Sequence, residues 1–120
     1  MLSYNISKNT WKTYDSDSEC FNKALSGHSG EIIMDNKMER LILFGGLDEN
    51  STYINQLYIL PTLSMYADQI DIKKNRKGIA IYPSARAYHS SNYSEGEKKI
   101  YIYGGTDMNI SNSKWSQINN

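Results

Sequence analysis

Two short apolar runs, each closed by a pair of glycines, are the clearest pattern along the chain. Residues 40–44 read Arg-Leu-Ile-Leu-Phe, residues 99–103 read Lys-Ile-Tyr-Ile-Tyr, and Gly-Gly follows each run. Short apolar runs that end at glycine are typical of buried β-strands. Because neither run alternates strictly between apolar and polar residues, both predict strands that are covered on both faces.

A polar turn and a shorter candidate strand precede each run. Residues 35–39 and 94–98 are polar, and before them residues 29–34 and 87–93 have the composition of strands. Each set therefore predicts a hairpin with a five-residue turn.

Further along, the same reasoning predicts strands rather than helices. Residues 53–60 predict a third strand, which Pro61 ends. Helix signals are weak, and the best window is residues 17–25, where Phe21 and Leu25 stand four positions apart. A helix of that length is not stable on its own. The pattern therefore predicts an all-β chain.

The two predicted hairpins belong to an internal repeat. Three landmarks recur in the same order after similar intervals: Gly45 as Gly104 after 59 residues, His28 as His89 after 61, and Tyr58 as Trp115 after 57. A period near fifty residues with several strands and no helix is typical of a β-propeller blade. Because the two histidines hold the same place in two repeats, we expect them to have similar surroundings and the same structural role.

The second of these units resembles a kelch repeat, in which an arginine and a histidine precede an apolar strand that ends in Gly-Gly. Residues 83–90 contain Arg86 and His89, and residues 100–105 supply the strand and its glycines. A Tyr and a Trp follow in the kelch pattern, and residues 112–118 resemble that segment.

The middle unit resembles the same family less completely. It matches at residues 27–29, 43–46 and 55–58, but Leu25 stands where the arginine is expected. Residues 1–14, which contain Trp11, resemble the end of another such unit. The resemblance thus extends over nearly the whole chain.

The resemblance implies an incomplete kelch-type β-propeller with four-stranded antiparallel blades. We expect residues 1–14 to form the C-terminal strands of a preceding blade, residues 15–72 a complete blade, and residues 73–120 most of a further blade. Propellers close with about 4–8 blades. The chain is therefore a fragment of a longer polypeptide, a part of a ring that other copies complete, or a truncated product that folds poorly. The start at Met1 inside a repeat favours the first interpretation.

Most of the distinctive residues have a structural explanation in this arrangement. The tryptophans are expected between blades, where each buries about 150–250 Å². The guanidinium of Arg86 is expected to form buried hydrogen bonds within its blade, because it offers five donors in a fixed fork. The glycine pairs allow positive φ and close backbone approach. The structural set is Trp11, His28, Gly45, Gly46, Tyr58, Arg86, His89, Gly104, Gly105 and Trp115.

Composition excludes several classes of function. The chain has 120 residues, with 13 basic and 13 acidic side chains and no net charge, so we expect neither a nucleic-acid partner nor a membrane partner. The basic residues 73–77 are interpreted as a solvated loop. One cysteine, Cys20, and the absence of a recognisable signal peptide favour the cytoplasm.

No arrangement of residues points to catalysis. The two histidines recur at a repeat position, and the chain has no zinc-type cysteine pair, phosphate-binding loop or nucleophile elbow. We therefore predict no catalytic residue, no metal and no cofactor. Cys20 is interpreted as an inert thiol.

The kelch resemblance implies a protein-binding module whose loops at one rim contact a protein partner. The loops at residues 47–52 and 106–111 are acidic, which favours a basic peptide segment as the ligand. The candidate partner-binding residues are Asp48, Glu49, Asn50, Asp107 and Asn109. The alternative is a fragment of a kelch-propeller enzyme, such as a galactose-oxidase-like oxidoreductase, a lyase or an epimerase, with its active site at a central channel that so few blades do not define.

Overall fold

The computed structural model describes residues 2–13, 24–63, 68–70, 83–107 and 116–119. Within these residues the chain forms nine β-strands and no helix. The strands are β1 (Leu2–Asn5), β2 (Thr10–Thr13), β3 (Ser29–Asp35), β4 (Met38–Phe44), β5 (Leu57–Pro61), β6 (Asp68–Ile70), β7 (Ser90–Ser94), β8 (Lys99–Tyr103) and β9 (Ser116–Asn119). Every strand pair is antiparallel, so the prediction of an all-β chain with antiparallel sheets is confirmed.

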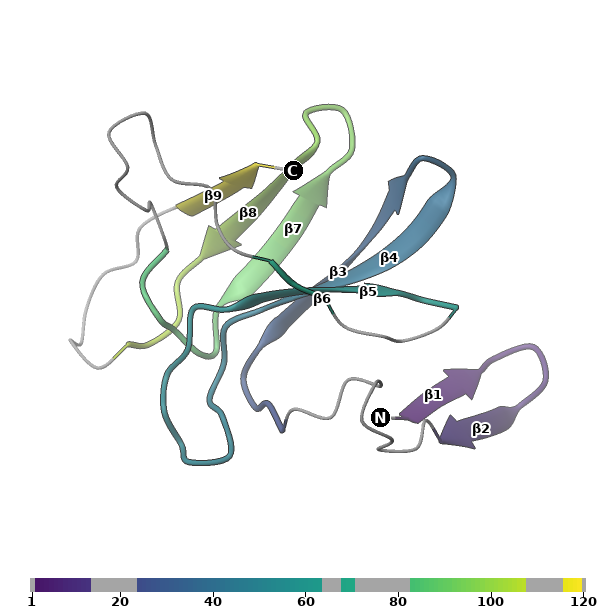
Figure 1. The fold of residues 1–120 in the computed structure, drawn as a ribbon, viewed down its shortest axis with the longest axis horizontal. Coiled ribbons are helices and arrows are strands. Elements are labelled where there is room, and N and C mark those ends of the chain that lie inside the picture. The colour runs from purple at the N-terminus through teal and green to yellow at the C-terminus, as the bar shows by residue number, and fades with distance from the viewer. Residues whose placement is uncertain (1, 14–23, 64–67, 71–82, 108–115, 120) are drawn as a thin grey trace.

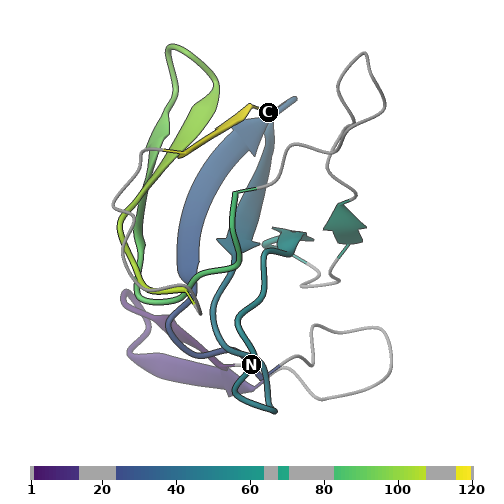
Figure 2. The same ribbon diagram turned by 90° about the vertical axis from the view of Figure 1, so that its left-hand side faces the viewer.

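The strands form three sheets (Figure 1), with two strands in the order β1-β2, four in the order β3-β4-β5-β6, and three in the order β7-β8-β9. Neighbouring strands in each sheet also follow one another in sequence. The two larger sheets lie side by side with β3 against β7, as Figure 2 shows. In the part of the chain that the structure describes, no helix is long and apolar enough to cross a membrane.

The hairpin of β3 and β4 has a shorter turn than the sequence predicted. Asn36 and Lys37 alone join β3 to β4, with φ values of 47° and 64°. Consecutive positive φ values are typical of a type I′ turn, whose twist matches that of the flanking strands. The predicted five-residue turn is wrong, because Asp35 and Met38 pair with each other. In the second hairpin the turn has four residues, 95–98.

This difference between the hairpins explains why the interval is 61 residues at the histidines and 59 at the glycines. Ser29 pairs with Phe44 across the first hairpin, and Ser90 pairs with Tyr103 across the second. The interval is 61 residues on the first strand of the hairpin and 59 on the second. In the β3–β4 hairpin two strands of seven residues are joined by a two-residue turn, whereas in the β7–β8 hairpin two strands of five residues are joined by a four-residue turn. The second hairpin is therefore two residues shorter, while its ends keep the same pairing.

The third strand and the β7 strand both begin later than the sequence predicted. Tyr53 forms only an isolated bridge with Leu47, and β5 begins at Leu57. Ala87 forms an isolated bridge with Thr106, and β7 begins at Ser90. In both cases the residues before the strand pair with a loop instead of the adjacent strand.

Apolar side chains from both larger sheets meet between them. The buried members of this cluster are Ile33, Ile42, Phe44 and Leu57 from the first sheet and Ile100 and Ile102 from the second. Alternate residues of a strand point to opposite faces, so Leu43 of β4 lies on the other face, in a second buried cluster with Tyr58 and Leu60. β4 is thus buried on both faces, as predicted. β8 is not, because Tyr103 is 43% exposed.

The N-terminal hairpin β1–β2 holds Trp11 in an unexpected environment. Trp11 is 70% exposed, and its ring lies 4.9 Å from that of Tyr4, which pairs with it across the hairpin. Among the described strands, β1 and β2 contact only each other. The predicted burial of Trp11 between blades is therefore not found, since no described sheet covers this hairpin. Trp115 lies outside the described residues, and the predicted domain limits near residues 14 and 72 fall on segments that are not described.

Candidate functional site at the junction of the two repeats

A short histidine loop precedes each hairpin and is attached to the Gly-Gly segment of its own repeat. Ser26 and Leu47 exchange two backbone hydrogen bonds of 3.0 and 2.8 Å, and Ala87 and Thr106 exchange two of the same lengths. The bridge closes the same loop in both repeats, with His28 or His89 two residues after it.

The second glycine of each pair lies directly under this loop. A Cβ atom on Gly46 would lie 2.8 Å from the carbonyl oxygen of the residue that opens the loop and 3.0 Å from the Cβ of His28. On Gly105 the same distances would be 2.6 Å and 2.9 Å, the second to the Cβ of His89. Contacts this close leave no room for a side chain. The backbone around the two histidines is therefore the same in both repeats.

The two histidine side chains nevertheless differ in their surroundings. His89 is only 8% exposed and lies between the sheets, where its Nε2 is 2.8 Å from the Ser29 Oγ and its ring meets that of Phe44 edge-on at 5.4 Å. His28 is exposed. The expectation of similar surroundings is therefore wrong for the side chains. The reason is that a preceding sheet packs on the repeat of His89, whereas among the described sheets none packs on the equivalent side of His28.

A second polar contact joins the sheets beside His89. The Ser91 hydroxyl donates a hydrogen bond of 2.6 Å to the Glu31 carboxylate. The contacts His89–Ser29 and Ser91–Glu31 both use residues of β3 that point toward β7. Neither Ser29 nor Glu31 was singled out from the sequence, although a serine follows both histidines and was a visible signal.

Burial lowers the pKa of His89 below the ordinary value of histidine, because the charged ring loses its contact with water. The positive charge of Arg86 lowers this pKa further, the backbone of Phe44 partly opposes the change, and the charge of His28 makes the smallest contribution, which also lowers the pKa. Burial at the junction therefore favours the neutral ring of His89 over the charged one.

We expect the free energy of unfolding to fall as the pH falls below about 6.5, where the histidine of an unfolded chain takes up a proton. The folded chain binds that proton only at lower pH, so the unfolded state binds more protons in between. The contribution of His89 to the free energy of unfolding is fully present above about pH 6.5. It is lost as the pH falls through the pKa of His89 in the folded chain, by at most about 1.4 kcal/mol per pH unit. Urea unfolding at about pH 7.5 and about pH 5.5 measures the change.

His89→Gln should remove this pH dependence, because glutamine does not titrate. His28→Gln is the matched control, since His28 is exposed in the equivalent backbone site. A dependence that persists in His89→Gln and disappears in His28→Gln would show that His28, and not His89, causes it.

The guanidinium of Arg86 is buried, and each of its three nitrogens donates a hydrogen bond within its own repeat. Arg86 is 6% exposed, its Nε and Nη2 donate to the backbone oxygen and the hydroxyl of Ser84 at 3.2 and 2.7 Å, and its Nη1 donates to the Gly104 oxygen at 3.1 Å. The predicted buried contact is confirmed. In the first repeat Leu25 takes this place and is partly buried against the second apolar cluster.

The backbone of Arg86 ties its repeat to the previous one. The Gly46 amide donates to the Arg86 oxygen at 2.8 Å, and the Arg86 amide donates to the Ile54 oxygen at 3.2 Å. A Cβ on Gly45 would lie 2.7 Å from that Arg86 oxygen and 2.9 Å from the His89 ring. The first glycine of the pair is therefore in contact with the next repeat.

Gly104, the counterpart of Gly45, has open space where Gly45 has a neighbour. Its φ of 73° is close to the 64° of Gly45, but a Cβ on Gly104 would meet nothing within 4 Å. The backbone is thus the same at both glycines, and only the following repeat is absent from the described residues.

The β4–β5 loop and residues 104–107, at the start of the β8–β9 loop, lie at the edge opposite the β3–β4 and β7–β8 turns (Figure 1). Tyr53 from the first loop lies near Thr106 in the second, with 3.3 Å between the Tyr53 hydroxyl and the Thr106 Oγ1. The structure therefore brings the first loop next to Thr106, at the start of the second, whose residues 108–111 lie outside the described residues.

The acidic residues at this edge have different roles. The Asp48 carboxylate accepts hydrogen bonds of 2.9 Å from the amides of Asn50 and Thr52, so it shapes its own loop. Glu49 and Asn50 are exposed, and Asp107 is half-buried. Asn109 lies outside the described residues. Of the candidate partner-binding residues in the first loop, Glu49 and Asn50 are therefore the exposed ones.

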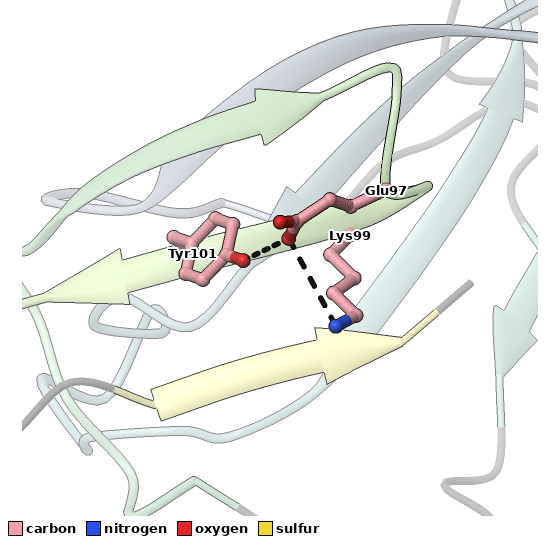
Figure 3. Close-up of polar contacts among 3 residues, drawn as sticks. All are labelled: Glu97, Lys99 and Tyr101. Atoms are coloured by element: carbon pink, nitrogen blue, oxygen red, sulfur yellow. Dashed lines mark hydrogen bonds and ion pairs between the residues drawn. The ribbon is translucent and has the colours of Figure 1, made fainter.

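The outward side of β8 carries a polar cluster (Figure 3). The Tyr101 hydroxyl donates a hydrogen bond to the carboxylate of Glu97, which also lies 3.9 Å from the Lys99 amine. The hydrogen bond with Glu97 raises the pKa of Tyr101, because it favours the protonated phenol. These residues face away from β3, because the neighbouring Ile100 and Ile102 point toward it.

In the described segments, no group of three or more His, Cys, Asp or Glu residues could hold a metal ion. Cys20 and the basic residues 73–77 lie outside those segments. Comparison of the sequence with protein families gives no match, and neither does comparison with curated proteins. The kelch resemblance therefore rests on the residues of the chain alone.

Proposed function

We propose that this chain is part of a kelch-type β-propeller that binds a protein partner through the loops at one edge. The observation that carries the proposal is the contact between the two repeats. The residues that resemble the kelch motif gather there, with Gly45 against Arg86 and His89, and Gly46 bonded to the Arg86 backbone. A motif that mediates contact between successive sheets is expected of radially stacked blades.

The two ends of the described array also support the proposal. A blade in a ring has a neighbour on each side, so a short array leaves one motif site open at each end. His28 is exposed at one end, and the space beside Gly104 is open at the other. Both are the positions that a preceding and a following blade would cover.

The loop edge gives the proposed binding surface its chemistry. Glu49 is exposed, and Asp107 lies in the adjacent loop that Tyr53 and Thr106 connect to the first. Loops on a rigid sheet scaffold commonly carry recognition. The chain as a whole has no net charge, so a local acidic edge rather than a general field would attract a basic segment.

The test is the binding of a fluorescent Lys/Arg-rich peptide to the chain, followed by anisotropy, with an acidic peptide of the same length for comparison. We expect the basic peptide to bind and Glu49→Lys to weaken it about tenfold, because a like charge replaces an attractive one. Thermal unfolding should be unchanged, since the Glu49 side chain is exposed.

Glu95→Lys is the matched control, because Glu95 is an exposed glutamate in the β7–β8 turn at the opposite edge. Equal weakening by both variants would mean that overall charge attracts the peptide and would overturn the assignment of the loop edge. Equal binding of the acidic peptide would do the same.

A further inference from the structure

Two sheet faces point away from the contact between the repeats. The β3 outer face consists of Gly30, Ile32 and Met34, which alternate with the residues that point toward β7. Leu41 and Leu43 of β4 lie on the same side of the sheet, where Leu43 is buried in the second apolar cluster and Leu41 packs against it. The β8 outer face consists of Ser90, Asn92, Tyr101 and Tyr103, which alternate with the residues that point toward β3.

The repeat relates these outer faces to the contact that the chain already makes. By the intervals of 61 and 59 residues, Ile32 corresponds to Tyr93 and Leu41 to Ile100. Tyr93 and Ile100 both belong to the apolar cluster between the sheets. In the same way Phe44, which lies in that cluster, corresponds to Tyr103. The β3 outer face is therefore equivalent to the face of the second repeat that packs inside the chain. The β8 outer face is equivalent to the face of the first repeat that packs there.

Both outer faces expose apolar surface. Ile32 and Met34 are each 51% exposed, and Tyr103 is 43% exposed. Exposed apolar residues that are adjacent on one face mark a surface for another molecule. Each outer face should bind a surface like the one that its equivalent face meets inside the chain.

The polar and steric parts of the internal contact are also present a second time. The bond between His89 and Ser29 has its counterpart in His28 and Ser90, both of which are exposed. The close approach at Gly45 has its counterpart at Gly104, where the space is open. The chain thus carries both components of a second contact, one at each end of the described array.

We propose that copies of this chain associate head to tail, with the β8 outer face of one copy on the β3 outer face of the next. His28 of one copy then meets Ser90 of the other, and Ile32 packs beside Tyr103. The contact repeats the arrangement within the chain, so it uses a surface that is already shaped for it. Because the two faces differ, the association is heterologous, and it adds copies until a ring closes or continues as an open filament. It uses surfaces other than the loop edge.

Sedimentation velocity of the purified chain between about 1 and about 100 µM tests this, because head-to-tail association raises the sedimentation coefficient with concentration. Ile32→Asp blocks the β3 outer face, and Gly104→Ala places a methyl group where the next copy must approach. Each should weaken association at least about tenfold. Leu63→Asp is the control, since Leu63 is 92% exposed and lies on neither face.

Mixing the two blocked variants gives the decisive result. Ile32→Asp keeps an intact β8 outer face, and Gly104→Ala keeps an intact β3 outer face, so the mixture should form dimers that grow no further, while each variant alone stays monomeric. A native chain that is monomeric at every concentration would overturn the proposal and would leave a further blade of a longer polypeptide as the occupant. Association of the single variants at native strength would also overturn it. Peptide binding at the loop edge is measured separately, so either proposal can fail alone.

Discussion

Gly45→Ala is expected to lower the free energy of unfolding by about 2–5 kcal/mol, whereas Gly104→Ala lowers it by about 1–2 kcal/mol. Both glycines have a left-handed backbone, with φ values of 64° and 73°, so alanine pays the same conformational cost at each. Only at Gly45 would the new Cβ also lie 2.7 Å from the Arg86 oxygen and 2.9 Å from the His89 ring. The extra cost comes from moving the second repeat away from the first.

Urea unfolding of the two variants beside the native chain measures this difference. The chain concentration should be low, so that contact between copies does not add to the cost at Gly104. An equal loss at both positions would contradict the prediction, because it would mean that the backbone conformation alone determines the effect and that the contact with Arg86 is not close.

Arg86→Ala is expected to destabilise the chain by about 2–4 kcal/mol. The change removes three hydrogen bonds from a side chain that is 6% exposed, and it leaves the Gly104 oxygen without its guanidinium donor. Arg86→Lys should recover little of this loss, since a single ammonium group does not reproduce the planar fork that reaches both Ser84 and Gly104.

Arg40→Ala is the matched control for this substitution. Arg40 forms an ion pair with Asp35 at 3.3 Å, but its side chain is 31% exposed, and ion pairs at the surface contribute about 0–1 kcal/mol. Chemical unfolding of the three variants should therefore rank Arg86→Ala and Arg86→Lys well below Arg40→Ala in stability. Similar losses for Arg86→Ala and Arg40→Ala would contradict the role given to the buried guanidinium.

Local pattern was sufficient where one stretch of chain determines the outcome. The strand at residues 99–103 has the predicted bounds, because a polar turn precedes the short apolar run and glycine ends it.

The two-residue turn at Asn36 and Lys37 was not predicted, since this pair lacks the glycine that usually marks such a turn. The Asp48 carboxylate, predicted to meet a partner, accepts a hydrogen bond from the backbone of its own loop, as aspartate often does in turns.

The surroundings of the histidines could not be predicted from their own repeats. His28 and His89 share a sequence context and a backbone site, yet only His89 is buried. The difference comes from a sheet that packs on one repeat and not on the other, which is a property of the array. The same is true of Gly45 and Gly104, and of Trp11, whose hairpin no described sheet covers.

The unequal hairpins also show that this unit can differ in length while the same faces remain packed. The second hairpin is shorter by an even number of residues, and both its strands keep their apolar side chains on the side that meets the neighbouring sheet. Because side chains alternate along a strand, loss of a single residue within a paired strand would turn the apolar side chains beyond it to the opposite face, unless a bulge absorbs the change. A residue gained or lost in the turn itself alters only the length of the loop, so the turns are where this unit changes length without disturbing the packed faces.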